Sequence, residues 1–369
     1  MNRIIRSRVR GAIVGTAIGD ALGMPAEGMT PQAIAQMYGR LRSFANPKGG
    51  TWAHTHHQLG RGQWTDDTQL MLAIGESLLA KKHVDFRDIA DRHISAMAEK
   101  RGWGGSTVTG VSKIRAGVNW WNSAKPEGAG NGTPMKIAAV GAVAGLGFLK
   151  PFDMASTVIN ISRMTHGDPR SAIAGIIQAE AIAIAIKGGP AALRLYLAQA
   201  DQRAESWERC VGSQAPLLSA NMSAGQSIIM RGGDLENLRS ALRAGCFVVQ
   251  SFPFTISAVL LMFDLPPDEC LSRIVEQGGD TDTTGAMAGA VLGAAHGMAS
   301  FPARLRRGLE GYKRLIALAD GLCAMTDMSE RPCVSGKSFS RPKISFSRGN
   351  EKPKTCQPLA DLALSAEGM

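Results

Sequence analysis

Helical periodicity is the feature that most constrains how this chain folds. Apolar residues recur at helical spacing in four long stretches, residues 66–80, 171–186, 236–252 and 304–325. No region shows sustained alternation of apolar and polar residues between hairpin turns, and clusters of strand-forming residues are scarce. The pattern therefore predicts an all-α protein.

The sequence also predicts a single compact multi-helix domain. Its 369 residues are 44% hydrophobic, which is enough for a large core. Loops rich in Gly, Pro and Asn fall at residues 46–62, 125–134 and 212–216, and none resembles a long linker. We place the domain at residues 1–325. Residues 326–369 are rich in Ser, Pro, Lys and Arg without periodicity, which predicts a disordered basic tail.

The net charge of +10 belongs to the two ends of the chain. Four arginines fall in residues 1–10 and seven Lys or Arg in residues 331–354, whereas residues 11–330 carry a net charge of only +2. The body of the protein therefore gives no sign of a nucleic-acid partner, although the basic tail leaves one open.

The N-terminus has basic residues before an apolar run, as a secretion signal does. Asp20 and the many glycines argue against a signal, and residues 11–22 are too short to span a bilayer. The six cysteines show no CxxC spacing, which predicts free thiols in a reducing compartment. We expect a cytoplasmic protein with no membrane partner.

Two acidic stretches stand out, each just before an apolar helical pattern. "WTDDT" contains Asp66 and Asp67, and "GGDTDTTGA" contains Asp280 and Asp282. Helix capping is the simplest interpretation, because acids suit the positive end of a helix and accept its free N–H groups. Capping explains one acid at each helix start well and two acids less well.

A metal site explains all four acids. The helix after Asp282 is rich in Gly and Ala, so we expect other elements to approach it closely and to bury its start. Unpaired carboxylates there are costly, and a divalent cation relieves that cost. Oxygen ligands suit Mg²⁺, Mn²⁺ or Ca²⁺ rather than Zn²⁺. Four carboxylates from two helix starts suit two metals roughly 3.5–4 Å apart.

Further polar residues interrupt apolar surroundings, namely Asp20, Glu27, Asn131, Lys136, His166, Asp168 and Arg170. Taken alone, each is typical of a cap or of a structural histidine, and Asp168 before Pro169 is an ordinary N-cap candidate. His54, His56 and His57 do not have zinc-ligand spacing, so we interpret them as loop residues near the rim of a cleft.

Five motifs, in order from about residue 8 to residue 300, resemble the ADP-ribosylglycohydrolase family. They are "GAIVGTAIGDALGMPAE", "WTDDT", "AGNGTPMK", "THGDPR" and "GGDTDTTGA". The resemblance implies an all-α fold with a central cleft holding two Mg²⁺ or Mn²⁺ ions. The ligands it implies are Thr65, Asp66, Asp67, Asp280, Asp282 and Thr283.

The resemblance further implies hydrolysis of the glycosidic bond that joins ADP-ribose to a modified side chain, with an ADP-ribosylated protein as substrate and ADP-ribose as product. The residues to which we assign catalytic roles are Glu27, Asp67 and Asp282, with Glu27 carrying a proton or positioning substrate. The residues to which we assign substrate contacts are Trp103, Gly105, Ser106, Asn131, Gly132 and His166.

One position departs from the nitrogen-regulation branch of that family. In "RGWGGSTVTG", Trp103 stands where that branch carries an acid. A tryptophan among glycines favours a wall of the substrate pocket, with a core position as the alternative.

Removal of ADP-ribose from arginine is our first hypothesis for the function. The alternatives are a non-catalytic ADP-ribose-binding or crystallin-like relative, a hydrolase of another ADP-ribosyl linkage, and a metal-dependent phosphohydrolase that cleaves the pyrophosphate.

Overall fold

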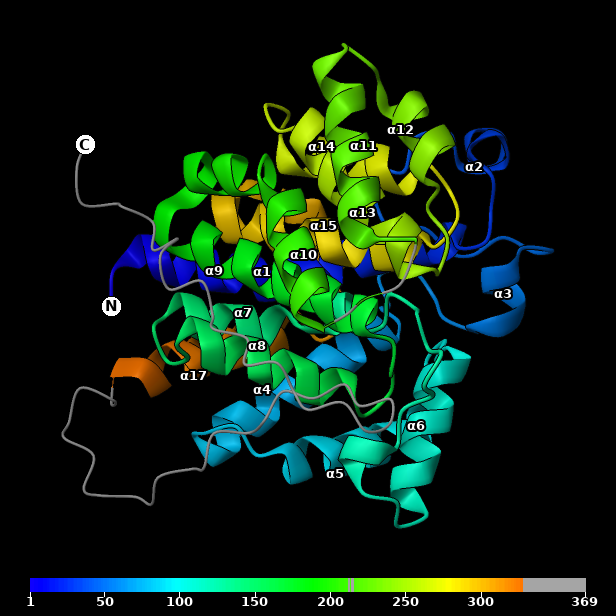
Figure 1. Cartoon of the computed structure of the whole chain (residues 1–369). Coiled ribbons are helices and arrows are strands. Elements are labelled where there is room, and N and C mark those ends of the chain that lie inside the picture. Colours follow the sequence, from blue (N-terminus) through cyan, green and yellow to red (C-terminus); the bar gives the residue numbers. More distant parts are fainter. Residues whose placement is uncertain (212, 214–215, 328–369) are drawn as a thin grey trace, which may run out of the picture.

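The computed structural model describes residues 1–211, 213 and 216–327, and helices make up most of this part of the chain (Figure 1). The described residues contain two isolated β-bridges and no strand, so the all-α prediction is confirmed. The α-helices are α1 (Arg3–Gly23), α2 (Pro31–Tyr38), α3 (Trp52–His56), α4 (Asp66–Lys81), α5 (Phe86–Ala96), α6 (Gly105–Arg115), α7 (Ala138–Gly145), α8 (Pro151–Ser162), α9 (Pro169–Leu197), α10 (Ala200–Val211), α11 (Leu218–Met230), α12 (Leu235–Leu242), α13 (Val248–Leu261), α14 (Pro267–Val275), α15 (Thr281–His296), α16 (Ala303–Arg307) and α17 (Tyr312–Asp327).

The antiparallel pair of α1 and α15 lies at the centre of the molecule (Figure 1). Four α1 residues spaced four apart share one face and oppose four α15 residues in reverse order: Gly11, Gly15, Gly19 and Gly23 face Gly293, Gly289, Gly285 and Thr281. A Cβ on Gly19 would lie 1.9 Å from the carbonyl oxygen of Gly285, so the two backbones are in direct contact. The Gly/Ala-rich α15 is therefore approached closely, as predicted, and its start lies against the end of α1.

Asp20 of α1 fixes the start of α4 beside this pair. Its carboxylate accepts hydrogen bonds from the backbone N–H groups of Thr65 and Thr68, at 2.8 and 3.0 Å, and from their hydroxyls, at 3.0 and 2.6 Å. Asp20 is fully buried, and its four donors satisfy its lone pairs. The first turns of α4 and α15 are thereby brought to the same end of α1.

Helix α9 is long and apolar enough to cross a membrane, by length and composition. In the folded chain 72% of its apolar window is buried inside the protein, which is the situation of a core helix. Gly189, with φ of 72°, and Pro190 interrupt its helical geometry.

The structure bears on two further predictions, the C-terminal boundary of the domain and the state of the cysteines. Helix α17 continues to Asp327, two residues beyond the boundary expected at residue 325, and the rest of the predicted disordered tail lies outside the described residues. Cys246 and Cys270 are free, as predicted for these two residues.

Candidate active site

The four acids that stood out in the sequence are all buried at the two helix starts. Asp66, Asp67, Asp280 and Asp282 are between 1% and 6% exposed. Neither N-cap residue, Thr65 of α4 or Asp280 of α15, makes a side-chain capping hydrogen bond. The capping interpretation therefore fails at both N-cap positions. Asp282 does accept a hydrogen bond of 2.9 Å from the backbone N–H of Thr283, so the other acids need another explanation.

Asp168 shows what a capping acid looks like in the same protein. Its carboxylate accepts a hydrogen bond of 2.9 Å from the backbone N–H of Arg170, in the first turn of α9. It also pairs with the Arg170 guanidinium at 2.8 Å. The N-cap prediction for Asp168 is confirmed.

Short contacts join three of the predicted metal residues, Thr65, Asp67 and Thr283. The Thr65 and Thr283 hydroxyls lie 3.3 and 3.4 Å from Asp67 Oδ2, so the cluster spans α4 and α15. Asn131, from the loop at 125–134, donates to Asp280 Oδ2 at 2.7 Å. The other oxygen of Asp67, Oδ1, is buried and has no hydrogen-bond partner in the described part of the chain. A buried carboxylate oxygen without a donor is a position that a cation stabilises.

The electrostatics of the cluster lead to the same conclusion. Burial, followed by the charge of Asp282, raises the pKa of both Asp66 and Asp67 well above the usual range. Burial and Asp282 also raise the pKa of Asp280 to about 7. Four buried carboxylates this close do not all ionise without added positive charge. Their oxygens fit hard divalent cations such as Mg²⁺ or Mn²⁺.

Glu27 belongs to the same cluster. It follows the 3₁₀ turn η1 (Met24–Ala26), which continues α1 toward the acids. Burial, and next the charges of Asp282 and Asp280, raise its pKa well above the usual range. One ligand atom from each of Glu27, His57 and Asp282 can be chosen so that all three lie within 4.8 Å of one another. The structure thus brings all three predicted catalytic residues, Glu27, Asp67 and Asp282, into one neighbourhood.

His57 is a site residue that the sequence analysis placed wrongly. Instead of lying at a rim, its ring is buried, and Nε2 contacts the Glu27 carboxylate. Gly102 makes room for it, because a Cβ there would lie 2.3 Å from His57 Cε1.

The predicted substrate residues fall on two sides of the loop at 125–134. The His166 ring occupies the space beside Gly132, where an added Cβ would lie 2.3 Å from His166 Cε1. Gly105 and Ser106 open α6, and Ser106 Oγ lies 3.2 Å from where a Cβ on Gly128 would be. Asn131, Gly132 and His166 are therefore brought together, with the start of α6 at the other end of the loop.

Trp103 packs differently from the other predicted substrate residues. It is 8% exposed and lies in the hydrophobic core, and its indole N–H donates to Gln69 of α4 at 2.7 Å. This packing corresponds to the core alternative, and contact of Trp103 with substrate stays a prediction.

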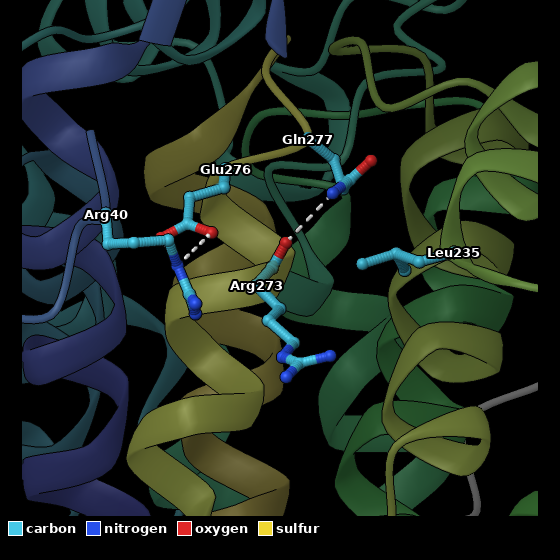
Figure 2. A pocket seen from close by; sticks show the side chains of 5 residues that line it. All are labelled: Arg40, Leu235, Arg273, Glu276 and Gln277. Atoms are coloured by element: carbon cyan, nitrogen blue, oxygen red, sulfur yellow. Dashed lines mark hydrogen bonds and ion pairs between the residues drawn. The ribbon is translucent and has the colours of Figure 1, made fainter. Parts of the chain in front are cut away.

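A surface pocket of about 340 Å³ lies elsewhere, lined by Arg40, Leu235, Arg273, Glu276 and Gln277 (Figure 2). Its arginines are already paired: Arg40 with Glu276 and Glu269, at 2.9 and 2.8 Å, and Arg273 with Glu269 at 2.8 Å. None of the predicted site residues lines it, so we assign no chemistry to this pocket.

The fold and the cluster together define a class: an all-α protein whose central helix pair gathers buried carboxylates suited to divalent cations. Residues 1–332 match the profile of the ADP-ribosylglycohydrolase family, and the chain belongs to that family. It is therefore a hydrolase that acts on ADP-ribosyl glycosidic bonds.

Characterised relatives cover most of the chain. It is 31% identical over 303 residues to the ADP-ribosyl-[dinitrogen reductase] glycohydrolase of Rhodospirillum rubrum, covering 81% of this chain and 88% of the relative. It is 26% identical over 348 residues to ADP-ribosylhydrolase ARH3 of Homo sapiens, covering 86% of this chain and 93% of the relative. A solved structure, an ADP-ribosylglycohydrolase-related protein complex, is similar with a TM-score of 0.65 and 27% identity, covering 88% of this chain and all of that one.

Proposed function

We propose that this protein removes ADP-ribose from modified proteins by hydrolysing the N-glycosidic bond to arginine, and so reverses mono-ADP-ribosylation. The observation that carries the proposal is the buried cluster of four carboxylates with an unpartnered oxygen on Asp67. The similarity to an ADP-ribosyl-[dinitrogen reductase] glycohydrolase supports a modified protein as the substrate, and the arginine linkage is the hypothesis that follows from the family resemblance.

The proposed cofactor is a pair of Mg²⁺ or Mn²⁺ ions. The chain would hold them with Thr65, Asp66 and Asp67 of the α4 start and Asp280, Asp282 and Thr283 of the α15 start. When bound, such ions supply positive charge that binds ribose hydroxyls and a water and polarises the reacting centre.

The surrounding residues of this chain hold the ligands in place. Asp20 anchors the start of α4 through its four hydrogen bonds, and Asn131 anchors Asp280 through one. Such supporting hydrogen bonds orient carboxylate ligands and typically matter by about 10–100-fold in metal affinity or activity.

Glu27 is the proposed proton carrier. Hydrolysis adds the hydroxyl of water to C1″ of ADP-ribose and breaks the C–N bond to the guanidine. Glu27 gives its proton to the departing nitrogen and takes up the proton that the water loses. Burial is the largest cause of the raised pKa of Glu27, and it remains when cations offset the neighbouring carboxylates, so this carboxyl group holds a proton that it can give to a leaving group. His57 contacts the Glu27 carboxylate and orients it.

One observation favours a second candidate substrate, ADP-ribose linked to serine. Trp103 occupies the position at which the nitrogen-regulation branch carries an acid, and its core packing offers no replacement for that acid. The test compares release of ADP-ribose from arginine-linked and serine-linked peptides under the same conditions. Faster release from arginine is the expected result, and release from serine alone would transfer the proposal to the other linkage.

A further inference from the structure

A buried hydrogen-bonded chain runs from Lys136 through Thr165 to His166, outside the carboxylate cluster. Lys136 Nζ lies 2.9 Å from Thr165 Oγ1, and the same oxygen lies 2.9 Å from His166 Nδ1. Lys136 and Thr165 are fully buried and His166 is 5% exposed. Lys136 belongs to the 3₁₀ turn η4 (Pro134–Lys136), and the other two residues follow α8.

The positions of the hydrogens in the Lys136–Thr165–His166 hydrogen bonds can be assigned by counting donors and acceptors. An ammonium group has only donors, so Thr165 Oγ1 accepts from Lys136. The Thr165 hydroxyl must then donate its own hydrogen elsewhere, and His166 Nδ1 is the acceptor within reach. Nδ1 therefore carries no hydrogen, and in the neutral ring the proton is on Nε2.

The charges around the chain agree with this assignment. Burial lowers the pKa of Lys136 to about 8, while Asp66 and Asp67 act to raise it, so the ammonium form prevails at neutral pH. Burial and the nearby Lys136 charge lower the pKa of His166 to about 3, so the imidazole is neutral. Deprotonation of Lys136 would let its amine accept from Thr165, and the constraint on His166 Nδ1 would be lost.

The other ring nitrogen of His166, Nε2, is not used by the described residues. Nε2 makes no hydrogen bond in the described part of the chain, and it lies 3.1 Å from where a Cβ on Gly130 would be and 2.8 Å from one on Gly132. It thus borders the glycine loop that carries Asn131, whose amide holds Asp280 of the carboxylate cluster.

We infer that Lys136, acting through Thr165, is a positioning residue that holds His166 with its proton on Nε2 and so presents this N–H to an oxygen of the bound substrate. The hydrogen-bonded chain itself is a property of the protein alone. The identity of the acceptor, an oxygen of ADP-ribose, rests on the proposed function.

The first test is the protonation pattern of His166 in the full chain, measured by NMR with ¹⁵N-labelled histidine and assigned by comparison with His166→Gln. The expected spectrum shows a proton bonded to Nε2 and a hydrogen-bonded, unprotonated Nδ1. A proton on Nδ1 in the wild-type protein would overturn the inference. The protonation pattern itself is read from the wild-type protein, and His166→Gln serves only to assign the signal.

The second test uses Thr165→Val, which keeps the shape and removes the hydroxyl, and Thr165→Ser, which keeps the hydroxyl. We expect Thr165→Val to lose the single protonation pattern and to weaken ADP-ribose binding about tenfold by calorimetry. Thr165→Ser should restore both. Lys136→Met should also weaken binding, whereas the same change at the exposed Lys187 should have no effect.

The outcomes separate this inference from the proposed function. If Thr165→Val changes neither the spectrum nor the dissociation constant, the inference is wrong. If the wild-type protein shows the expected spectrum but does not bind ADP-ribose, the positioning chain stands and the proposed function fails.

Discussion

At the scale of single residues, the decisive question for each aspartate is what its side chain binds. Asp168 accepts a backbone N–H and closes a helix start, as a capping residue does. Asp67 also lies at a helix start, but among the described residues one of its oxygens has no hydrogen-bond partner and the other contacts the hydroxyls of Thr65 and Thr283. The same residue type at the same kind of position thus serves stability at Asp168 and, in our proposal, cation binding at Asp67.

Replacing Asp282 by Asn tests the ligand-binding role. We expect Asp282→Asn to lower turnover more than about 100-fold. Loss of a metal ligand should reduce activity more than loss of a residue that only hydrogen-bonds to a ligand. The metal-free variant should melt about 2 °C or more above the metal-free wild type, since a buried charge beside other carboxylates has been removed. Thermal unfolding and release of ADP-ribose measure the two effects.

The matched control is Asp264→Asn, whose side chain is 83% exposed. It should leave turnover unchanged and the melting temperature nearly so. An Asp282→Asn protein with full activity would contradict the assignment of Asp282 to the metal site.

Replacing Asp168 by Ala tests the opposite role. The change removes the cap of α9 and the pairing with Arg170, so we expect the free energy of unfolding to fall by about 1 kcal/mol. Turnover at a temperature where the variant is folded should stay within about twofold of the wild type. A loss as large as that of Asp282→Asn would place Asp168 in the catalytic machinery instead.

At the scale of helices, the pair of α1 and α15 sets the site. Its glycines allow backbone contact along both helices, and this contact brings Asp20 and Glu27 of the α1 end toward Asp280 and Asp282 of the α15 start. A side chain anywhere along the seam would separate the helices and with them the two halves of the carboxylate cluster.

Gly19→Ala tests this seam. The new Cβ would lie 1.9 Å from the Gly285 carbonyl oxygen, so we expect a loss of about 3 kcal/mol in the free energy of unfolding. Gly49→Ala is the control, because a Cβ there meets nothing within 4 Å. Equal denaturation midpoints for the two variants would show that the close contact between α1 and α15 does not stabilise the fold.

Many features of the helices were predictable from the sequence. The helices and the two acidic helix starts follow from the 3.6-residue period and from the placement of Asp66 and Asp280 before apolar runs. The Gly/Ala content of α15 also indicated close packing. The partner helix was not predicted, although Gly11, Gly15 and Gly19 recur every four residues as the glycines of α15 do.

The roles of Asp20 and His57 were not predicted, because they depend on contacts between distant segments. Asp20 fixes α4 from another helix, and His57 reaches Glu27 from a loop, and neither has a local pattern that announces its partner. Trp103 shows the converse, because glycine neighbours suggested a pocket wall while tertiary packing buries it against Gln69.

At the scale of the whole molecule, the raised carboxyl pKa values link stability to pH and to metal. Burial and Asp282 raise the pKa of Asp280 to about 7, against about 4 for an unfolded chain. The folded protein therefore binds this proton more tightly than the unfolded chain, and the associated stability is lost as pH rises through about 7.

The prediction concerns the metal-free protein in chelator. As pH falls from 8 to 6, the free energy of unfolding of the wild type should gain roughly 1 kcal/mol relative to Asp280→Asn. The comparison with this variant cancels the opposite contribution of the buried His57, His93 and His166, whose pKa values are lowered by burial. Saturating Mn²⁺ should remove the difference in slope, because the cation replaces the proton. Parallel pH profiles of the two proteins in chelator would contradict the account.

The most direct test of the central claim is the release of ADP-ribose from ADP-ribosylated arginine by the purified protein, with Mg²⁺, with Mn²⁺ and with chelator. Metal-dependent release of free ADP-ribose is the predicted result, and it would tie the carboxylates of α4 and α15 to glycosidic-bond hydrolysis. Release that chelator does not diminish, or cleavage that yields AMP in place of ADP-ribose, would contradict it.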